Sequence, residues 1–324
     1  MPTRRRVGIG TLAALAAPRI ARAQAGWPGE RPIEVVVPYP PGGGVDSTTR
    51  VVLRFVQNHL PGARFVVVNR PGAGGQLGYE AVFNAPADGW TLCAVTAPAV
   101  LAMPIERPVR YQPLEFTFLA NVVDDPNAFF VAAGSRLRTL ADLVAAARAQ
   151  PQALSYGSTG VGGDDHIAML AFEALSGIPP MVHAPFAGSA PGTQALLGGH
   201  LGLLVGNISE GLSLMREGQL RCLGVAAPAR FAQAAGVPTF REQGFDLAAG
   251  ASRGLVGPPG MPAAVRTRLE AAFTAALADA AFLQEAQRLG MSLRPLVGED
   301  YRRMLAGMDA SLRDLWRRRP WREG

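Results

Sequence analysis

The segment Ile33–Asp46, IEVVVPYPPGGGVD, contains the features that decide the fold. Its β-branched run up to Val37 predicts a short strand, and the three glycines that follow predict a tight loop. Asp46 is placed to cap a helix after that loop. Phe65–Asn84 repeats the order of strand, glycine loop and helix. Each loop directs backbone N–H groups and a helix N-terminus at one point, which suits an anion.

Neither loop matches a nucleotide-binding motif. A P-loop needs Gly-Lys-Ser/Thr, and the chain contains no lysine. Gly72–Gly75 lacks the third glycine of a dinucleotide fingerprint, and no acidic residue ends a following strand. A third glycine loop, Gly157–Gly163, follows the predicted strand Leu154–Tyr156 and opens a helix at Asp164.

Residues 1–25 have the order of an export signal. Arg4–Arg6 form a basic start, Val7–Ala17 is a short apolar run, and Ala21–Ala25 offers small-residue cleavage sites. Thr3-Arg4-Arg5 leaves the twin-arginine route open beside the Sec route. We therefore expect a periplasmic protein that is exported with a cleavable N-terminal signal.

Signal removal changes the charge of the protein. Residues 1–25 hold five arginines and no acid, so the formal net charge falls from +6 to +1. The basic character is thus mainly a targeting property, and no nucleic-acid partner is expected. The mature chain has no run of transmembrane length.

Strand and helix predictions alternate through most of the mature chain, which indicates an α/β fold. About 300 residues suit two lobes better than one core. We predict that the strand Phe116–Val123 is broken by Asp124–Asn127 and that a new strand begins at Phe129. We also predict chain crossings near 124–129 and 244–253, which gives lobe I as 26–125 with 251–324, and lobe II as 126–250. A ligand cleft between the lobes would close on this two-segment hinge.

The two cysteines, Cys93 and Cys222, lie in apolar runs assigned to different lobes. Two buried free thiols are therefore favoured over one disulfide, although export would permit a disulfide. No Cys/His cluster has the spacing of metal ligands.

Six sequence motifs of a known family occur in this chain, in the same order as in the family. The chain resembles the periplasmic solute receptors of tripartite tricarboxylate transporters, often called Bug proteins, at residues 36–46, 68–78, 85–92, 160–166, 186–202 and 237–244. The similarity covers essentially the whole mature chain. It implies a type II periplasmic-binding-protein fold and a receptor, not an enzyme. Such a receptor captures a small carboxylate without cofactor or metal and passes it to two transporter membrane subunits. We expect a monomer.

The resemblance also implies a set of ligand-binding residues. In relatives, the loops after the first strands of both lobes grip the carboxylate groups, mostly with backbone donors. In lobe I the matching positions are Tyr39, Pro41, Gly42, Gly43, Val45, Asp46, Gln76 and Thr96. In lobe II they are Ser158, Thr159, Gly160, His166, Ala187, Gly188, Ser189 and Asn207. Any of these residues taken alone also fits a purely local role in a turn or cap.

Several positions depart from the family pattern. Ala187 stands where relatives usually carry Lys or Arg, and Gln76 replaces Asn. Asp164 and Asp165 add negative charge beside the third loop. These changes favour a monocarboxylate, an amino acid or an aromatic acid over a tricarboxylate. Arg253 either restores the missing cation or is a solvated hinge arginine.

Three alternatives stay open at this level. The same clamshell can serve as a ligand sensor for a two-component system. An orphan receptor without its own membrane subunits is a second alternative, because relatives often occur in many copies. A hydrolase would use Ser189 with His183 and Asp164. However, Gly188–Pro191 lacks the second glycine of Gly-x-Ser-x-Gly.

Overall fold

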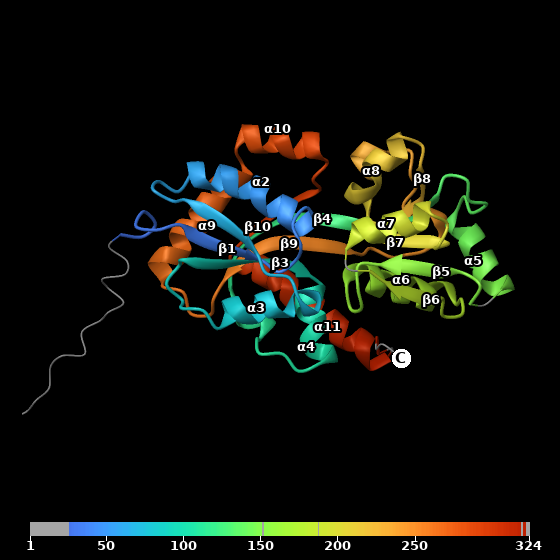
Figure 1. Ribbon diagram of the computed structural model, residues 1–324, viewed down its shortest axis with the longest axis horizontal. Helices are drawn as coiled ribbons and strands as arrows, with labels where there is room; N and C mark the ends of the chain where they lie inside the picture. The colour runs from blue at the N-terminus through green and yellow to red at the C-terminus, as the bar shows by residue number, and fades with distance from the viewer. Residues whose placement is uncertain (1–25, 151, 187, 319, 322–324) are drawn as a thin grey trace, which may run out of the picture.

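The computed structural model describes residues 26–150, 152–186, 188–318 and 320–321. Two α/β lobes lie side by side, and strands β4 (Thr117–Ala132) and β9 (Gly250–Gly257) run between them (Figure 1). The predicted export signal and Ala187 lie outside the described residues.

The first lobe is built from both ends of the described chain. Its N-terminal elements are β1 (Ile33–Val37), α2 (Gly44–Asn58), β2 (Phe65–Asn69), α3 (Gln76–Phe83), β3 (Thr91–Ala97) and α4 (Ala99–Glu106). Its C-terminal elements are α9 (Ala263–Leu277), α10 (Ala280–Leu289), β10 (Leu293–Val297) and α11 (Glu299–Arg318).

The second lobe is built from the middle of the chain. Its elements are α5 (Leu140–Ala149), β5 (Ser155–Ser158), α6 (Asp164–Ser176), β6 (Val182–Pro185), α7 (Ser189–Leu197), β7 (Leu203–Asn207), α8 (Ile208–Arg216) and β8 (Leu220–Val225). The glycine loops predicted after Val37 and before Asp164 lead directly into α2 and α6.

One sheet path passes through both lobes in the order β2-β1-β3-β9-β4-β7-β5-β6. Within the lobes, β1 pairs in parallel with β2 and β3, and β5 pairs in parallel with β6 and β7. The joining strands β4 and β9 are antiparallel to each other. The two parallel sets are thus linked through an antiparallel centre.

Strand β4 corrects one prediction. The sequence predicts that Asp124–Asn127 breaks one strand and that another begins at Phe129, but the structure has one strand of 16 residues. Residues 117–126 pair with β9, whereas 127–132 pair with β7 and β8. The register shifts in these ladders lie between Phe118 and Val123 and between Phe129 and Phe130, on either side of the turn-prone residues. Pairing with strands of both lobes therefore overrides the local turn signal.

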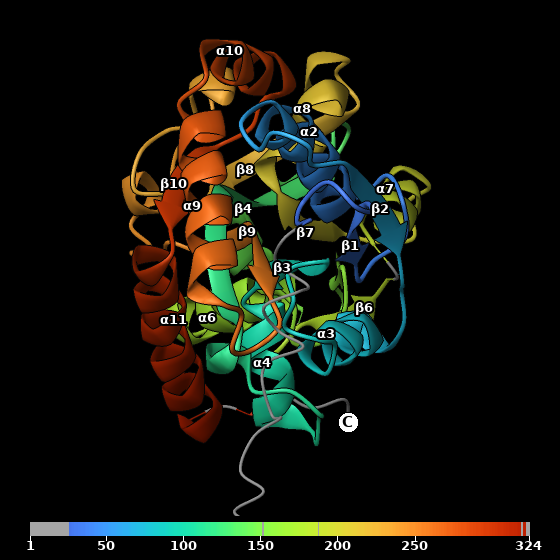
Figure 2. The same cartoon turned by 90° about the vertical axis from the view of Figure 1, so that its left-hand side faces the viewer.

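The apolar cores explain why the C-terminal helices belong to the first lobe. One cluster joins Val35 and Leu92 to Phe273, and another joins Tyr79 to Tyr301. Figure 2 shows α9 lying over the strands of this lobe and α11 running beside it. The second lobe has its own clusters around Phe129, Phe172 and Phe130.

Both cysteines are buried and free, Cys93 on β3 and Cys222 on β8. Among the described helices, none combines the length and apolar character needed to cross a bilayer.

Candidate functional site

The first glycine loop, residues 38–43, is held in shape by a buried carboxylate. Asp46 Oδ2 accepts hydrogen bonds from the Gly42 N–H (2.9 Å) and from Arg50 Nε (3.0 Å). Asn69 Nδ2 donates to Asp46 Oδ1 (2.9 Å) and to the Tyr39 carbonyl (3.0 Å). Although burial opposes it, these hydrogen bonds hold the pKa of Asp46 below its ordinary value. Asp46 therefore supports the loop from within the lobe.

The third glycine loop, residues 158–163, is held in the same way. Asp165 Oδ2 accepts from the Thr159 N–H (3.1 Å) and from Thr159 Oγ1 (2.7 Å), and Asp165 Oδ1 accepts from Asn127 Nδ2 (2.9 Å). Burial, with the adjacent charge of Asp164, raises the pKa of Asp165 well above its ordinary value. Gly42 (φ +87°) and Gly160 (φ +135°) adopt backbone conformations that side chains rarely permit.

Other predicted residues of the third loop also use their polar atoms locally. Ser158 Oγ donates to the Gly160 carbonyl (3.1 Å) and lies 2.7 Å from His183 Nε2. His166 Nδ1 accepts from the Gly162 N–H (3.1 Å), and its ring stacks on His183 at 4.2 Å between centroids. Side chains thus take up the N–H groups of Thr159, Gly160 and Gly162 and hold the loop in a fixed shape.

Arg253 links the two glycine loops at the centre of the molecule. Its strand β9 places it opposite Thr96 of β3 on one side and Val123 of β4 on the other. A Cβ atom added to Gly44, at the end of the first loop, would lie 2.7 Å from Arg253 Cζ. The guanidinium therefore packs directly on the start of α2.

Two residues of other strands, Asp125 on β4 and Asn207 at the end of β7, accept hydrogen bonds from the Arg253 guanidinium. Nη1 donates to Asp125 Oδ2 (2.9 Å) and Nη2 donates to Asn207 Oδ1 (2.8 Å). Asn207 Nδ2 in turn donates to Asp164 Oδ2 (2.8 Å), at the start of α6. Contacts thus run from the first loop through Arg253 and Asn207 to the end of the third loop.

The charge around Arg253 is dominated by carboxylates. Asp125 is 1% exposed and Arg253 6% exposed, so this ion pair is shielded from water. Glu210 Oε1 lies 3.8 Å from Nη2. Burial lowers the pKa of Arg253, but the charges of Asp125, Glu210 and Asp164 outweigh burial and raise it above its ordinary value. Burial also raises the pKa of Glu210 to about 7.

The structure also places the remaining predicted residues. Tyr39 Oη lies 3.1 Å from Tyr79 Oη, and burial raises the pKa of Tyr39. Gln76 donates to Glu80 and accepts from Arg107 within lobe I. Pro41, Gly42 and Gly43 are exposed, Val45, Gly188 and Ser189 are half-buried, and Thr96 is buried beside Arg253.

The residues considered for a hydrolase are not assembled. His183 is within hydrogen-bond distance of Ser158 and not of Ser189. Asp164 accepts hydrogen bonds from Asn127 and Asn207. The described residues also contain no group of three His, Cys, Asp or Glu side chains that could hold a metal.

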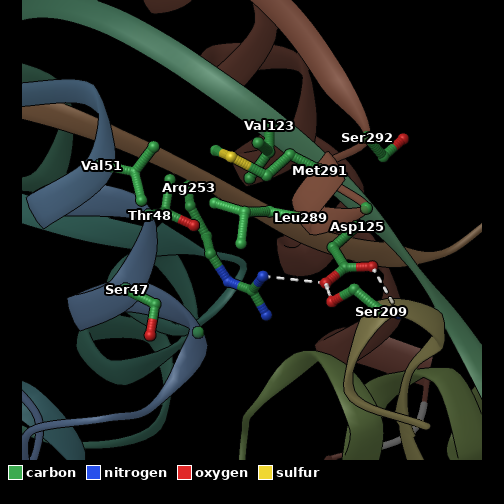
Figure 3. Close-up of a pocket in the computed structure, with 12 residues that line it drawn as sticks. Ser47, Thr48, Val51, Val123, Asp125, Ser209, Arg253, Leu289, Met291 and Ser292 are labelled. Atoms are coloured by element: carbon green, nitrogen blue, oxygen red, sulfur yellow. Dashed lines mark hydrogen bonds and ion pairs between the residues drawn. The ribbon is translucent and has the colours of Figure 1, made fainter. Parts of the chain in front are cut away.

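A cavity of about 150 Å³ lies beside Arg253, between α2 and residues 289–292, which are the last residue of α10 and the three that follow it (Figure 3). It is lined by Gly44, Ser47, Thr48, Val51, Val123, Asp125, Ser209, Arg253, Leu289, Gly290, Met291 and Ser292. Among the described residues predicted for the site, none lines this cavity. Sequence reasoning missed Asp125, Glu210 and the apolar wall because no motif contains them. Among the residues that line this cavity, the sequence singled out only Arg253, as a candidate cation.

Comparison with known proteins identifies the family. A model of the tripartite tricarboxylate transporter family receptor matches residues 49–313. A UPF0065 protein from the tcbD–tcbE intergenic region of Pseudomonas sp. (strain P51) is 32% identical over 266 residues, 81% of this chain and 78% of that protein. Protein BugT of Bordetella pertussis is 32% identical over 218 residues, 66% of each chain.

Solved structures match over nearly the whole chain. A TctC solute-binding protein from Polaromonas is 29% identical, with TM-score 0.70, covering 90% of this chain and 99% of that one. An R. palustris protein solved with adipate is 26% identical, with TM-score 0.82 over 90% and 97% of the two chains. MatC of Rhodopseudomonas palustris, solved with malate, is 25% identical, with TM-score 0.78 over 88% and 99%.

Proposed function

The chain belongs to the tripartite tricarboxylate transporter receptor family, and on that premise we propose that it captures a small carboxylate between its lobes and delivers it to transporter membrane subunits. The observation that carries this proposal is the convergence of two glycine loops on Arg253. Each loop is held by a buried aspartate and ends at a helix N-terminus. The remaining N–H groups of the loops and the adjoining helix N-termini would donate to a carboxylate, and closure of the lobes would shield it from water.

The charges in the site favour a ligand of low charge. Asp125 already neutralises Arg253, and Glu210 and Asp164 lie close to the same guanidinium. A second or third ligand carboxylate would lose its hydration without gaining a free cation. We therefore favour a monocarboxylate, an amino acid or an aromatic acid. The relatives solved with adipate and malate support the carboxylate class.

Receptors of this family are periplasmic and bind solutes; they are not enzymes. For this chain, we propose export by the signal in residues 1–25 and closure of the lobes around the ligand. The closed form would then present both lobes to the membrane subunits. Uptake of the bound acid by cells, measured with and without the gene for this chain, tests the delivery step.

Ligand binding is tested by calorimetry on residues 26–324, unfolded and refolded to remove bound ligand. Gly43→Val should weaken carboxylate binding at least tenfold, because the added side chain would lie on the proposed binding loop and exclude the ligand. The variant should still fold, since Gly43 is exposed and its Cβ position is open apart from Pro40 O at 3.9 Å. Gly236→Val is the matched control, since that glycine is exposed and has no atom near its Cβ position. Equal affinity in both variants would reject the loop assignment.

A further inference from the structure

The cavity beside Arg253 has an apolar wall contributed by separate elements. Val51 comes from α2, Val123 from β4, and Leu289 and Met291 from the end of α10 and the residues after it. Figure 3 shows the Arg253 side chain between Thr48 and Leu289, with its guanidinium turned toward Asp125. The cavity is thus a chamber between an apolar wall and a buried ion pair.

The ion pair of this chamber does not suit a second charge, and the remaining polar side chains are the uncharged hydroxyls of Ser47, Thr48, Ser209 and Ser292. Asp125 Oδ2 accepts from Arg253 Nη1 and from Ser209 Oγ, so the ion pair is internally balanced. An isolated carboxylate or ammonium placed against Val51, Leu289 and Met291 would lose its hydration without compensation. An uncharged apolar group would instead bury its surface there. A cavity of about 150 Å³ has room for a group the size of benzene.

The chamber adjoins the proposed carboxylate site. Gly44 lines the chamber and directly follows Gly43 of the first loop. Arg253 belongs to both sites, and within the described chain its buried Nε donor has no hydrogen-bond partner. A ligand carboxylate at the loops could therefore take up this donor while the rest of the ligand enters the chamber.

We propose that the chamber binds an aromatic ring, or an alkyl group of similar size, of a monocarboxylate whose carboxylate lies at the glycine loops and Arg253. This inference rests on the proposed receptor function and names its ligand class. It makes Val51, Leu289 and Met291 specificity-determining residues. They would select apolar monocarboxylates over dicarboxylates of the same length.

Calorimetry with two matched probe pairs tests this selectivity on refolded residues 26–324. Benzoate and acetate differ by the ring, whereas hexanoate and adipate differ by a second carboxylate on the same carbon chain. We expect benzoate to bind at least tenfold more tightly than acetate, and hexanoate at least tenfold more tightly than adipate.

Filling the chamber should remove this preference. Met291→Trp is expected to lower benzoate affinity at least tenfold and acetate affinity less than twofold. Leu283→Trp is the control, because Leu283 is 44% exposed on α10 and does not line the chamber. If thermal melts show that Met291→Trp does not fold, Ser292→Leu fills the rim from a half-buried position.

The outcomes separate the two proposals. If carboxylates bind but adipate equals hexanoate and the filled variants keep wild-type benzoate affinity, the chamber proposal is overturned and the receptor function stands. If the wild-type protein binds neither these four acids nor malate, citrate and the common amino acids, the receptor proposal fails and the chamber proposal with it.

Discussion

At the residue scale, the aspartates of the two loops have a structural task. Asp46 and Asp165 each lie in the first turn of a helix and turn their carboxylates back onto the preceding glycine loop. The family resemblance had suggested Asp46 as a ligand contact, but its oxygens are engaged within lobe I. Asp46 therefore stays a predicted ligand-binding residue, and the contacts that the structure gives it support the loop.

Glu210 should give the protein a measurable pH dependence. Its pKa is raised from 4.5 to about 7 in the folded state, so between these values the folded protein binds more protons than the unfolded chain. Stability from this group is therefore present at low pH and is lost as pH rises through 7. Relative to wild type, Glu210→Gln should gain roughly 1–3 kcal/mol between pH 4.5 and 8.

Urea unfolding of wild type and Glu210→Gln at both pH values measures this change. The comparison with the variant is needed because burial lowers the pKa of His183 to about 4. His183 therefore makes the free energy of unfolding rise with pH, which is opposite to the effect of Glu210. A difference between the two proteins that stays constant with pH would contradict the assignment.

At the element scale, the contact between β4 and β9 depends on glycine. A Cβ atom at Gly254 would lie 2.4 Å from the Ala120 carbonyl of β4 and 2.7 Å from Tyr301 Oη of α11. A side chain at this position would therefore separate the joining strands from each other and from α11. The geometry explains why β9 can be nearly fully buried between its neighbours.

Gly254→Ala should lower the free energy of unfolding by roughly 1–3 kcal/mol, because the backbone carbonyl cannot move aside cheaply. Gly307→Ala is the matched control within α11. Its Cβ position is open, so the change should raise stability by roughly 0.5–1 kcal/mol through helix propensity. Denaturant unfolding of both variants measures these changes in stability. Equal unfolding midpoints for the two variants would be inconsistent with a tight β4–β9 contact.

At the scale of the whole molecule, lobe I depends on both ends of the described chain. Trp27 and Val35 share one core with Phe273, while Tyr301, Leu305 and Trp321 share another with Tyr79. Lobe II, by contrast, is continuous in sequence. The lobes should therefore respond differently to loss of the C-terminus.

A chain ending at Gly298 removes α11 and should unfold lobe I. All four tryptophans of the sequence, at 27, 90, 316 and 321, lie in this lobe, so fluorescence reports on it selectively. Trp27 and Trp90 are 4% and 5% exposed. We expect a red-shifted emission from these two residues, while circular dichroism retains part of the helical signal. Native-like emission with a cooperative melt would show that α11 is dispensable.

The sequence alone determined the family, the α/β class and the positions of most elements. The resemblance to Bug receptors and the type II binding-protein fold are confirmed by the family match and the solved relatives. These features were readable because strand periodicity, glycine loops and helix caps are local signals. The domain boundaries and the ligand-binding residues remain predictions.

Tertiary structure decided what local signals do not encode. Asp124–Asn127 reads as a turn, yet strands from both lobes pair with it and make β4 continuous. Arg253 donates a hydrogen bond to Asp125 and packs against Gly44. Both contacts exist only because distant segments pack at the joining strands. The chamber of Val51, Val123, Leu289 and Met291 likewise has no sequence signature, since its shape is set by packing between separate elements.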